Sequence, residues 1–249
     1  MTEEHVDPEA DAAEGAEEQA SAVTRQLNWM IDKVISDGVG PLTGAITWAD
    51  DRLAQAHRRR LGMSAAEAAR DGVPGEPTDA DMERAIRRLI RESVEAAGVA
   101  GFAAGLGGFV TMPVTIPANM AGAFVINARL AAAIAHLRGY DPMDPHVRTV
   151  VTMMAVGSNA QQIARAVGIR IGEKAAMQAI RRIPIAVIRQ INKKAGFYLL
   201  AKYGSRRSML TLAKGVPLVG GVVGGSVDAT MTGLVGRTAN RMFKDSDDD

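Results

Sequence analysis

The sequence contains no cysteine, and aromatic residues make up only 4% of it. Without cysteine, neither disulfide bonds nor thiolate metal sites can form. Apolar residues nevertheless account for 47% of the chain, a share close to the globular average. Because alanine supplies much of this apolar content and glycine is abundant beside it, we expect helices that approach one another closely.

Charge is missing from two long stretches. No charged residue occurs between Glu95 and Arg129, and Asp228 is the only one within 216–236. Such segments must lie away from water, either in a tightly packed helical core or in a membrane. The first stretch is only moderately hydrophobic and is rich in glycine, so a single free-standing transmembrane helix is disfavoured. Insertion as a broken or re-entrant hairpin stays open.

Helical spacing dominates the chain, and strand signals are almost absent. We expect a helix over 23–36, a break at 38–41, and a second helix that runs to His57. In the loop that follows, Ser64-x-x-Glu67 has the form of a capping box for one short turn. Thr78, with acids directly after it, is a good start for the next helix. Further helices are expected at 117–137 and beyond 146.

These patterns predict one all-α domain, a multi-helix bundle with Gly-rich, closely packed central helices. We place this helical domain at residues 22–243 and its motif-bearing part at 78–243. The ends, 1–21 and 244–249, are dominated by acids and alanine and are expected to be disordered acidic tails.

Glycines spaced four apart, as in Gly101-x-x-x-Gly105, place bare backbone on one helix face. The same spacing occurs twice in the second uncharged stretch, so the two stretches are expected to pack backbone against backbone. The expected close-packing glycines are Gly101, Gly105, Gly107, Gly108, Gly220, Gly221, Gly224 and Gly225.

Asp228 stands alone in an apolar stretch, and an isolated buried carboxylate must be paired, protonated or solvated. Arg129, which ends the first uncharged run, is the expected partner. With Asp141, these residues form a candidate buried polar site, although a structural ion pair or cap explains Asp228 equally well. His136, Asp141, Asp144 and His146 lie close in sequence, but their spacing matches no metal motif, and no metal is expected.

The segment 165–207 is strongly basic and contains an amphipathic helical pattern. A solvated face, an anionic lipid surface or a protein partner would each explain it. Nucleic acid is the weakest reading, because aromatic residues for base stacking are scarce. The candidate lipid- or partner-binding residues are Arg181, Arg182, Arg189, Lys193, Lys194, Arg206 and Arg207.

Catalytic and nucleotide-binding motifs are missing. The run from Gly105 to Gly108 lacks the third glycine of the dinucleotide fingerprint and follows no strand. Gly172-Glu173-Lys174 does not complete a phosphate-binding loop, and no nucleophile elbow occurs. We therefore expect no cofactor, and the catalytic residues of any enzymatic activity are unknown.

Three motifs resemble the EcsC protein family. They are Ala97–Pro113 (AGVAGFAAGLGGFVTMP), Gly139–Pro142 (GYDP) and Pro217–Asp228 (PLVGGVVGGSVD), in the family's order. The resemblance implies a mostly helical bacterial protein without a settled activity, named for a gene beside that of an ABC transporter. It singles out Gly107, Gly108, Thr111, Pro113, Tyr140, Asp141, Pro217, Gly224 and Asp228.

The leading interpretation is a non-enzymatic, membrane-associated accessory or scaffold protein that binds anionic lipid or a membrane protein, an ABC transporter among the candidates. We expect it in the cytoplasm, peripheral at the inner face of the membrane, with insertion left open. The alternative is a hydrolase or small-ligand-binding protein with a site around Asp228, Arg129 and the loop from His136 to His146.

Overall fold

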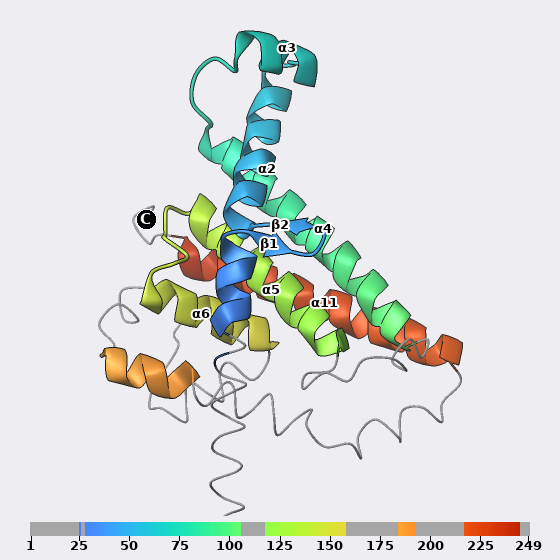
Figure 1. Ribbon diagram of the computed structural model, residues 1–249. Coiled ribbons are helices and arrows are strands. Elements are labelled where there is room, and N and C mark those ends of the chain that lie inside the picture. The colour runs from blue at the N-terminus through green and yellow to red at the C-terminus, as the bar shows by residue number, and fades with distance from the viewer. Residues whose placement is uncertain (1–24, 26–27, 106–117, 158–183, 193–216, 245–249) are drawn as a thin grey trace, which may run out of the picture.

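Regular structure in the described part of the chain is helical apart from one two-stranded hairpin, which confirms the all-α prediction. The computed structural model describes residues 25, 28–105, 118–157, 184–192 and 217–244 (Figure 1). Helical segments at 28–35 and 185–192 accompany the labelled elements. Those are β1 (Gly38–Val39), β2 (Leu42–Thr43), α2 (Ala45–Arg60), α3 (Ala65–Asp71), α4 (Asp79–Gly105), α5 (Ala118–Leu137), α6 (Pro145–Val156) and α11 (Pro217–Phe243).

The break expected at 38–41 is a small antiparallel hairpin, in which Gly38 pairs with Thr43. Gly38 has a φ of 92°, and a Cβ atom there would lie 1.9 Å from the Leu42 carbonyl oxygen. Only glycine can occupy this position. The hairpin turns the chain from the 28–35 segment into α2, which runs to Arg60 rather than ending at His57.

Two helix starts were predicted correctly from local chemistry. Ser64 and Glu67 form the expected capping box: the Glu67 amide donates to Ser64 Oγ, and the Ser64 amide donates to Glu67 Oε2 at 2.8 Å. At the start of α4, the Asp81 amide donates to the Thr78 hydroxyl. Both caps satisfy amides that have no partner within their helix.

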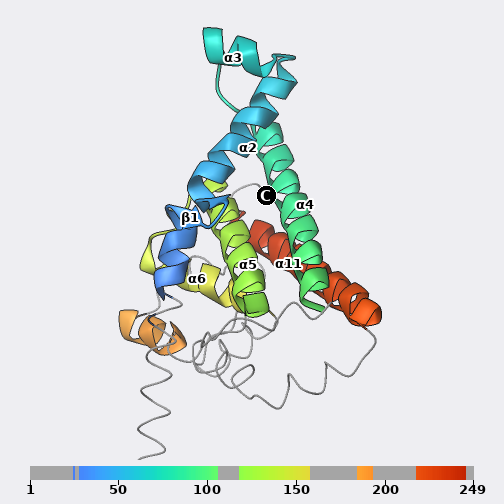
Figure 2. The same ribbon diagram turned by 45° about the vertical axis from the view of Figure 1, so that its right-hand side comes forward.

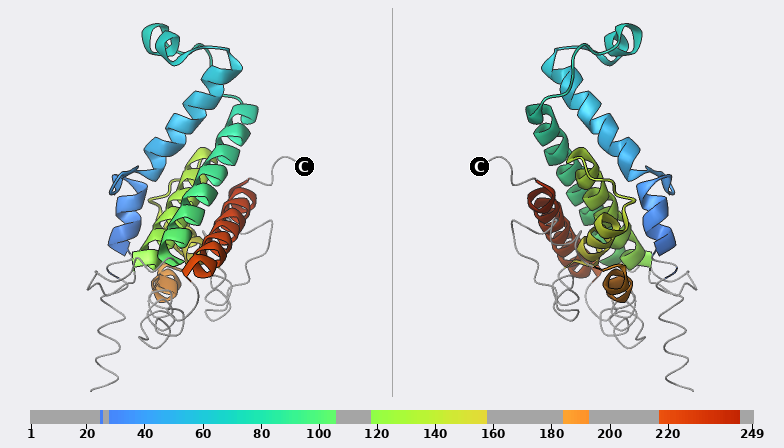
Figure 3. Two further views of the ribbon diagram at one scale, coloured as in Figure 1. Left: turned by 90° about the vertical axis from the view of Figure 1, so that its right-hand side faces the viewer. Right: turned by 90° about the vertical axis from the view of Figure 1, so that its left-hand side faces the viewer.

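Helices α4 and α5 occupy the middle of the bundle. They lie between α2 on one side and α11 on the other, and α6 packs against α5 (Figure 2 and Figure 3). The short helix α3 stands apart at the end where α2 turns back toward α4. The C-terminus of α4 and the N-terminus of α11 lie together away from α3, whereas the 185–192 segment lies on the other side of the molecule, near α6 (Figure 1 and Figure 2).

The core is centred on α5, whose residues from Leu130 to Ala135 are all fully buried. A helix that is apolar on every side must be enclosed by its neighbours, and its alanines let those neighbours come close. The largest fully buried side chains around it include Ile31, Ile35, Ile86, Leu89, Val150, Val151 and Phe243.

The turn after α5 ties three elements together. Gly139 has a φ of 80°, the left-handed conformation in which glycine commonly ends a helix. Arg138 donates to Glu83 on α4 and to Asn240 on α11. The ring of Tyr140, a residue of the second motif, lies 5.4 Å from that of Phe243. These contacts hold the C-terminal end of α11 against the core.

Candidate functional site

The two uncharged stretches meet along the antiparallel pair formed by α4 and α11. A Cβ atom on Gly225 would lie 2.7 Å from the Gly98 carbonyl oxygen, and one on Gly224 would lie 3.0 Å from that of Gly101. The helix backbones therefore touch at these four glycines. Gly105, Gly220 and Gly221 belong to the same two helices, whereas Gly107, Gly108, Thr111 and Pro113 lie outside the described residues.

Asp228 lies beside this contact, on α11. Its Oδ2 atom is 2.5 Å from the position that a Cβ atom would take on Gly101, so the carboxylate rests against bare backbone of α4. Burial raises the pKa of Asp228 above its ordinary value of 3.8. The described residues offer this carboxylate no ion pair that would offset its loss of water.

The end of this helix pair exposes apolar side chains. Val99 and Phe102 on α4 are 71% and 38% exposed, and Val222 and Val227 on α11 are 62% and 53% exposed. We call these four residues the apolar tip. No charged residue lies in 96–105 or 217–227, the parts of the two helices that carry them. Among the described helices, none is long and apolar enough to cross a bilayer.

Arg129 is not the partner of Asp228, so that prediction is wrong. Its guanidinium donates to the carbonyl oxygen and the hydroxyl of Thr43, at 2.8 and 2.9 Å, and lies 4.0 Å from the centre of the Trp48 ring. Burial, together with the charge of Arg52, lowers the pKa of Arg129 to about 10. Arg129 thus links α5 to the hairpin and α2 on a different side of α5 from α11.

Asp141 is exposed, so its placement in a buried polar site is also wrong. Its carboxylate accepts the Met143 amide at 2.8 Å, as expected for a turn before a helix. Asp144 caps α6 and accepts the amides of His146 and Val147. His136 pairs with Asp50 on α2 instead. No metal-binding group of three such side chains occurs in the described residues.

Of the predicted basic surface, only Arg189 is described. It is exposed on the 185–192 segment, where Ile188 and Ile191 are buried. This is the amphipathic arrangement expected from the sequence. The other candidates lie outside the described residues: Arg181, Arg182, Lys193, Lys194, Arg206 and Arg207.

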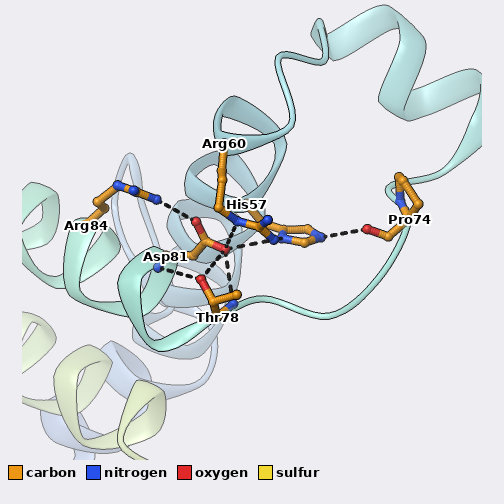
Figure 4. Close-up of polar contacts among 6 residues, drawn as sticks. All are labelled: His57, Arg60, Pro74, Thr78, Asp81 and Arg84. Carbon is orange, nitrogen blue, oxygen red and sulfur yellow. Dashed lines mark hydrogen bonds and ion pairs between the residues drawn. The ribbon is translucent and has the colours of Figure 1, made fainter.

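A cluster around Asp81 was missed by sequence reasoning (Figure 4). This carboxylate is completely buried between the C-terminal end of α2 and the start of α4. Thr78 donates to it through both its amide and its hydroxyl, at 3.0 and 2.9 Å. Arg60 and Arg84 donate to it from α2 and α4, each at 2.8 Å. Burial opposes ionisation, but these hydrogen bonds outweigh it and lower the pKa of Asp81.

His57, on α2, completes the cluster. Its Nε2 atom lies 3.2 Å from the Pro74 carbonyl oxygen, which can only accept, so Nε2 carries the proton. Its Nδ1 atom lies 2.9 Å from Nη2 of Arg60, which can only donate. The same Nδ1 atom lies 3.3 Å from Oδ2 of Asp81, which can only accept, so His57 bridges the carboxylate, Arg60 and the loop before α4. The signals for this cluster were local, Thr78-x-x-Asp81 and His57-x-x-Arg60, but their meeting depends on how α2 lies on α4.

The comparison with protein families agrees with the three motifs. The model of the EcsC protein family matches residues 50–245. The chain belongs to the EcsC family. The matched range includes most of α2 and all of α3, which precede the motifs. No curated protein and no solved structure matches the chain. Family membership supplies no activity, so functional arguments must come from the geometry.

Proposed function

We propose that this EcsC-family protein is a non-enzymatic, membrane-associated accessory protein whose apolar tip contacts an anionic bilayer. The observation that carries the proposal is the exposure of Val99, Phe102, Val222 and Val227 at the end of an uncharged helix pair. Exposed apolar side chains concentrated at one end of a helix pair are found at sites that bind a membrane or a partner.

The shape of the helix pair suits shallow insertion. Because Gly98, Gly101, Gly224 and Gly225 bring the backbones into contact, the pair presents a narrow end. Asp228 lies just behind that end, where burial raises its pKa.

The binding free energy available from these side chains indicates that the apolar tip does not hold the protein on a membrane alone. Full burial of a valine or phenylalanine side chain is worth roughly 1.5–3 kcal/mol, and these side chains are only partly exposed at the start. A few kcal/mol corresponds to weak, about millimolar binding. Each lysine or arginine near an anionic surface adds about 1 kcal/mol. The basic residues of 165–207 would supply that second contribution, which makes the binding sensitive to salt.

The alternative site has little geometric support. Arg129 binds Thr43 and Trp48, His136 binds Asp50, and Asp228 rests on Gly101. These side chains belong to separate contacts and do not surround one common cavity. The geometry therefore favours the membrane proposal over a site around Asp228.

The test is co-sedimentation of the full chain with vesicles that contain phosphatidylglycerol, at low and at high salt. We expect salt-sensitive binding that Val222→Asp weakens by about ten-fold, because a carboxylate must then enter the interface. The matched control is Leu234→Asp, another exposed apolar position on α11, about 18 Å farther along the helix. This control should bind like the wild type.

Three results would overturn the lipid proposal. The wild type could stay in the supernatant with anionic vesicles at low salt, or the two aspartate variants could lose binding equally. The chain could also bind native membranes but lose that binding after the membranes are treated with protease, which would assign the tip to a membrane protein.

A further inference from the structure

A second surface, far from the apolar tip, gathers positive charge. Helices α2 and α4 enclose a cleft of about 280 Å³ between them. Five arginines line it: Arg52, Arg59 and Arg60 from α2, and Arg84 and Arg88 from α4. We call it the arginine cleft. Its remaining lining residues are Gln55, Ala56 and Ala85.

Helical spacing explains how the arginines come to face one another. On α2 they lie at positions 52, 59 and 60, and on α4 at positions 84 and 88, so each set shares one helix face. Between them, Ala56 and Ala85 are buried. These small side chains leave an open space at the level of the guanidinium groups.

Two acids hold four of the arginines in place. Asp81 accepts Arg60 and Arg84, each at 2.8 Å. Glu92 accepts Arg52 at 2.9 Å and Arg88 at 2.8 Å. Each guanidinium has five N–H groups and uses only one or two of them in these bonds, so donors remain for a ligand. The carboxylates therefore fix the arginines without using up their capacity to bind.

The charge of the cleft is not neutralised by these acids. Burial disfavours the ionised form of Glu92, but hydrogen bonds from Arg88 and Arg52 outweigh this and lower its pKa. With Asp81 and Glu92 both ionised, five positive and two negative charges leave a net charge of three positive. The described residues provide no hydrogen bond or ion pair for the side chain of Arg59.

We propose that the arginine cleft binds a compact anion that carries two or more phosphate groups. Arginine forks match the oxygens of phosphate in paired hydrogen bonds. A diphosphate group carries about the charge needed to balance the cleft, and a space of about 280 Å³ holds a group of that size but not a large ligand.

The position of the cleft favours a soluble ligand over a lipid headgroup. Along α4, Arg88 lies 14 residues before Phe102, a distance of about 21 Å in a helix. Figure 1 shows the helix segments that form the cleft on the side of α3, away from the tip. This step alone rests on the proposed membrane contact, because a tip placed in a bilayer points the cleft away from it.

The test is calorimetric titration of the full chain with inorganic pyrophosphate at low salt, without vesicles. We expect saturable binding that Arg59→Gln weakens by about ten-fold, since hydrogen bonds to a charged group are lost. Arg58→Gln removes the same charge from the neighbouring position, which does not line the cleft, and should change the affinity by less than about two-fold. Arg59 is exposed and Arg58 is half-buried, and the described residues form no ion pair with either, so both variants should fold.

Two further measurements distinguish phosphate from other anions and a soluble ligand from a lipid headgroup. Citrate, with a similar charge but no phosphate, should bind more weakly than pyrophosphate, and Arg59→Gln should leave co-sedimentation with phosphatidylglycerol vesicles unchanged. The proposal is overturned if pyrophosphate does not bind, if both arginine variants weaken it equally, if citrate binds as tightly, or if Arg59→Gln abolishes vesicle binding. Because the titration contains no lipid, failure of the membrane proposal would leave its result intact.

Discussion

The carbonyl oxygen of Gly98 lies 2.7 Å from the point where a Cβ atom would stand on Gly225. A backbone atom in a packed helix cannot move aside as the end of a side chain can. The α4–α11 contact therefore depends on the missing side chain at Gly225, and the same interface offers a matched comparison at Gly98.

We expect Gly225→Ala to lower the free energy of unfolding. Alanine gains about 1 kcal/mol in helix propensity, but forcing the helices apart costs about 1–3 kcal/mol, for a net loss of up to about 2 kcal/mol. Gly98→Ala places its methyl group at ordinary contact distances of 3.7 and 3.8 Å. That variant should be stabilised by about 0.5–1 kcal/mol. Urea unfolding measures both, and a stabilised Gly225→Ala would contradict the close contact.

Asp228→Asn should be at least as stable as the wild type near neutral pH. Because burial raises the pKa of Asp228, the folded state favours the protonated form and pays for ionisation. The free energy of unfolding of the wild type should therefore rise relative to that of Asp228→Asn as the pH falls through the folded-state pKa of Asp228 toward 3.8. Urea unfolding as a function of pH measures this difference. Asp51→Asn, at an exposed position on α2, is the control, and a clear loss of stability in Asp228→Asn at neutral pH would contradict the assignment.

Local chemistry carried most of what the sequence could predict. Ser64, Glu67 and Thr78 act on amides within three residues, so their roles follow from spacing alone. The apolar run 130–135 within α5 likewise favours a buried helix. The two glycine-rich stretches share a need for close packing, and in the structure they meet along α4 and α11.

Long-range pairing could not be predicted in the same way. The predicted pairing of Arg129 with Asp228 rests only on the isolation of each charge, one at the end of an apolar stretch and the other within one. The structure turns Arg129 toward Thr43, 86 residues earlier in the chain, and sequence spacing does not fix the rotation of a helix within a bundle. Asp81 was read only as an acid near a helix start, since the donors from α2 reach it through tertiary packing.

Arg129→Lys should lower the free energy of unfolding by about 1 kcal/mol, because lysine cannot keep both the paired hydrogen bonds to Thr43 and the stacking on Trp48. Double-mutant cycles test which partner is real. The cycle with Thr43→Ala should show a coupling of at least about 0.5 kcal/mol, and the cycle with Asp228→Asn less than that. A larger coupling energy with Asp228→Asn than with Thr43→Ala would instead support an ion pair between Arg129 and Asp228.

Asp81→Asn should be the most damaging of these substitutions near neutral pH. The buried carboxylate accepts from Thr78, Arg60 and Arg84, and an amide would present two hydrogens to groups that can only donate. The control is Asp79→Asn, at an exposed position on the same helical turn, where surface substitutions change stability by about 0.5 kcal/mol or less.

The effect of Asp81→Asn should also depend on pH in a defined direction. Since the pKa of Asp81 is lowered in the folded state, its stabilisation is present above the ordinary value of 3.8 and is lost as the pH falls below it. The gap in urea midpoint between wild type and Asp81→Asn should therefore narrow in acid. For Asp228→Asn, the stability of the wild type relative to the variant rises as the pH falls. The two aspartates therefore contribute to stability with opposite pH dependence. A gap for Asp81→Asn that stays constant down to the acid transition would mean that the loss comes from packing and not from the buried charge.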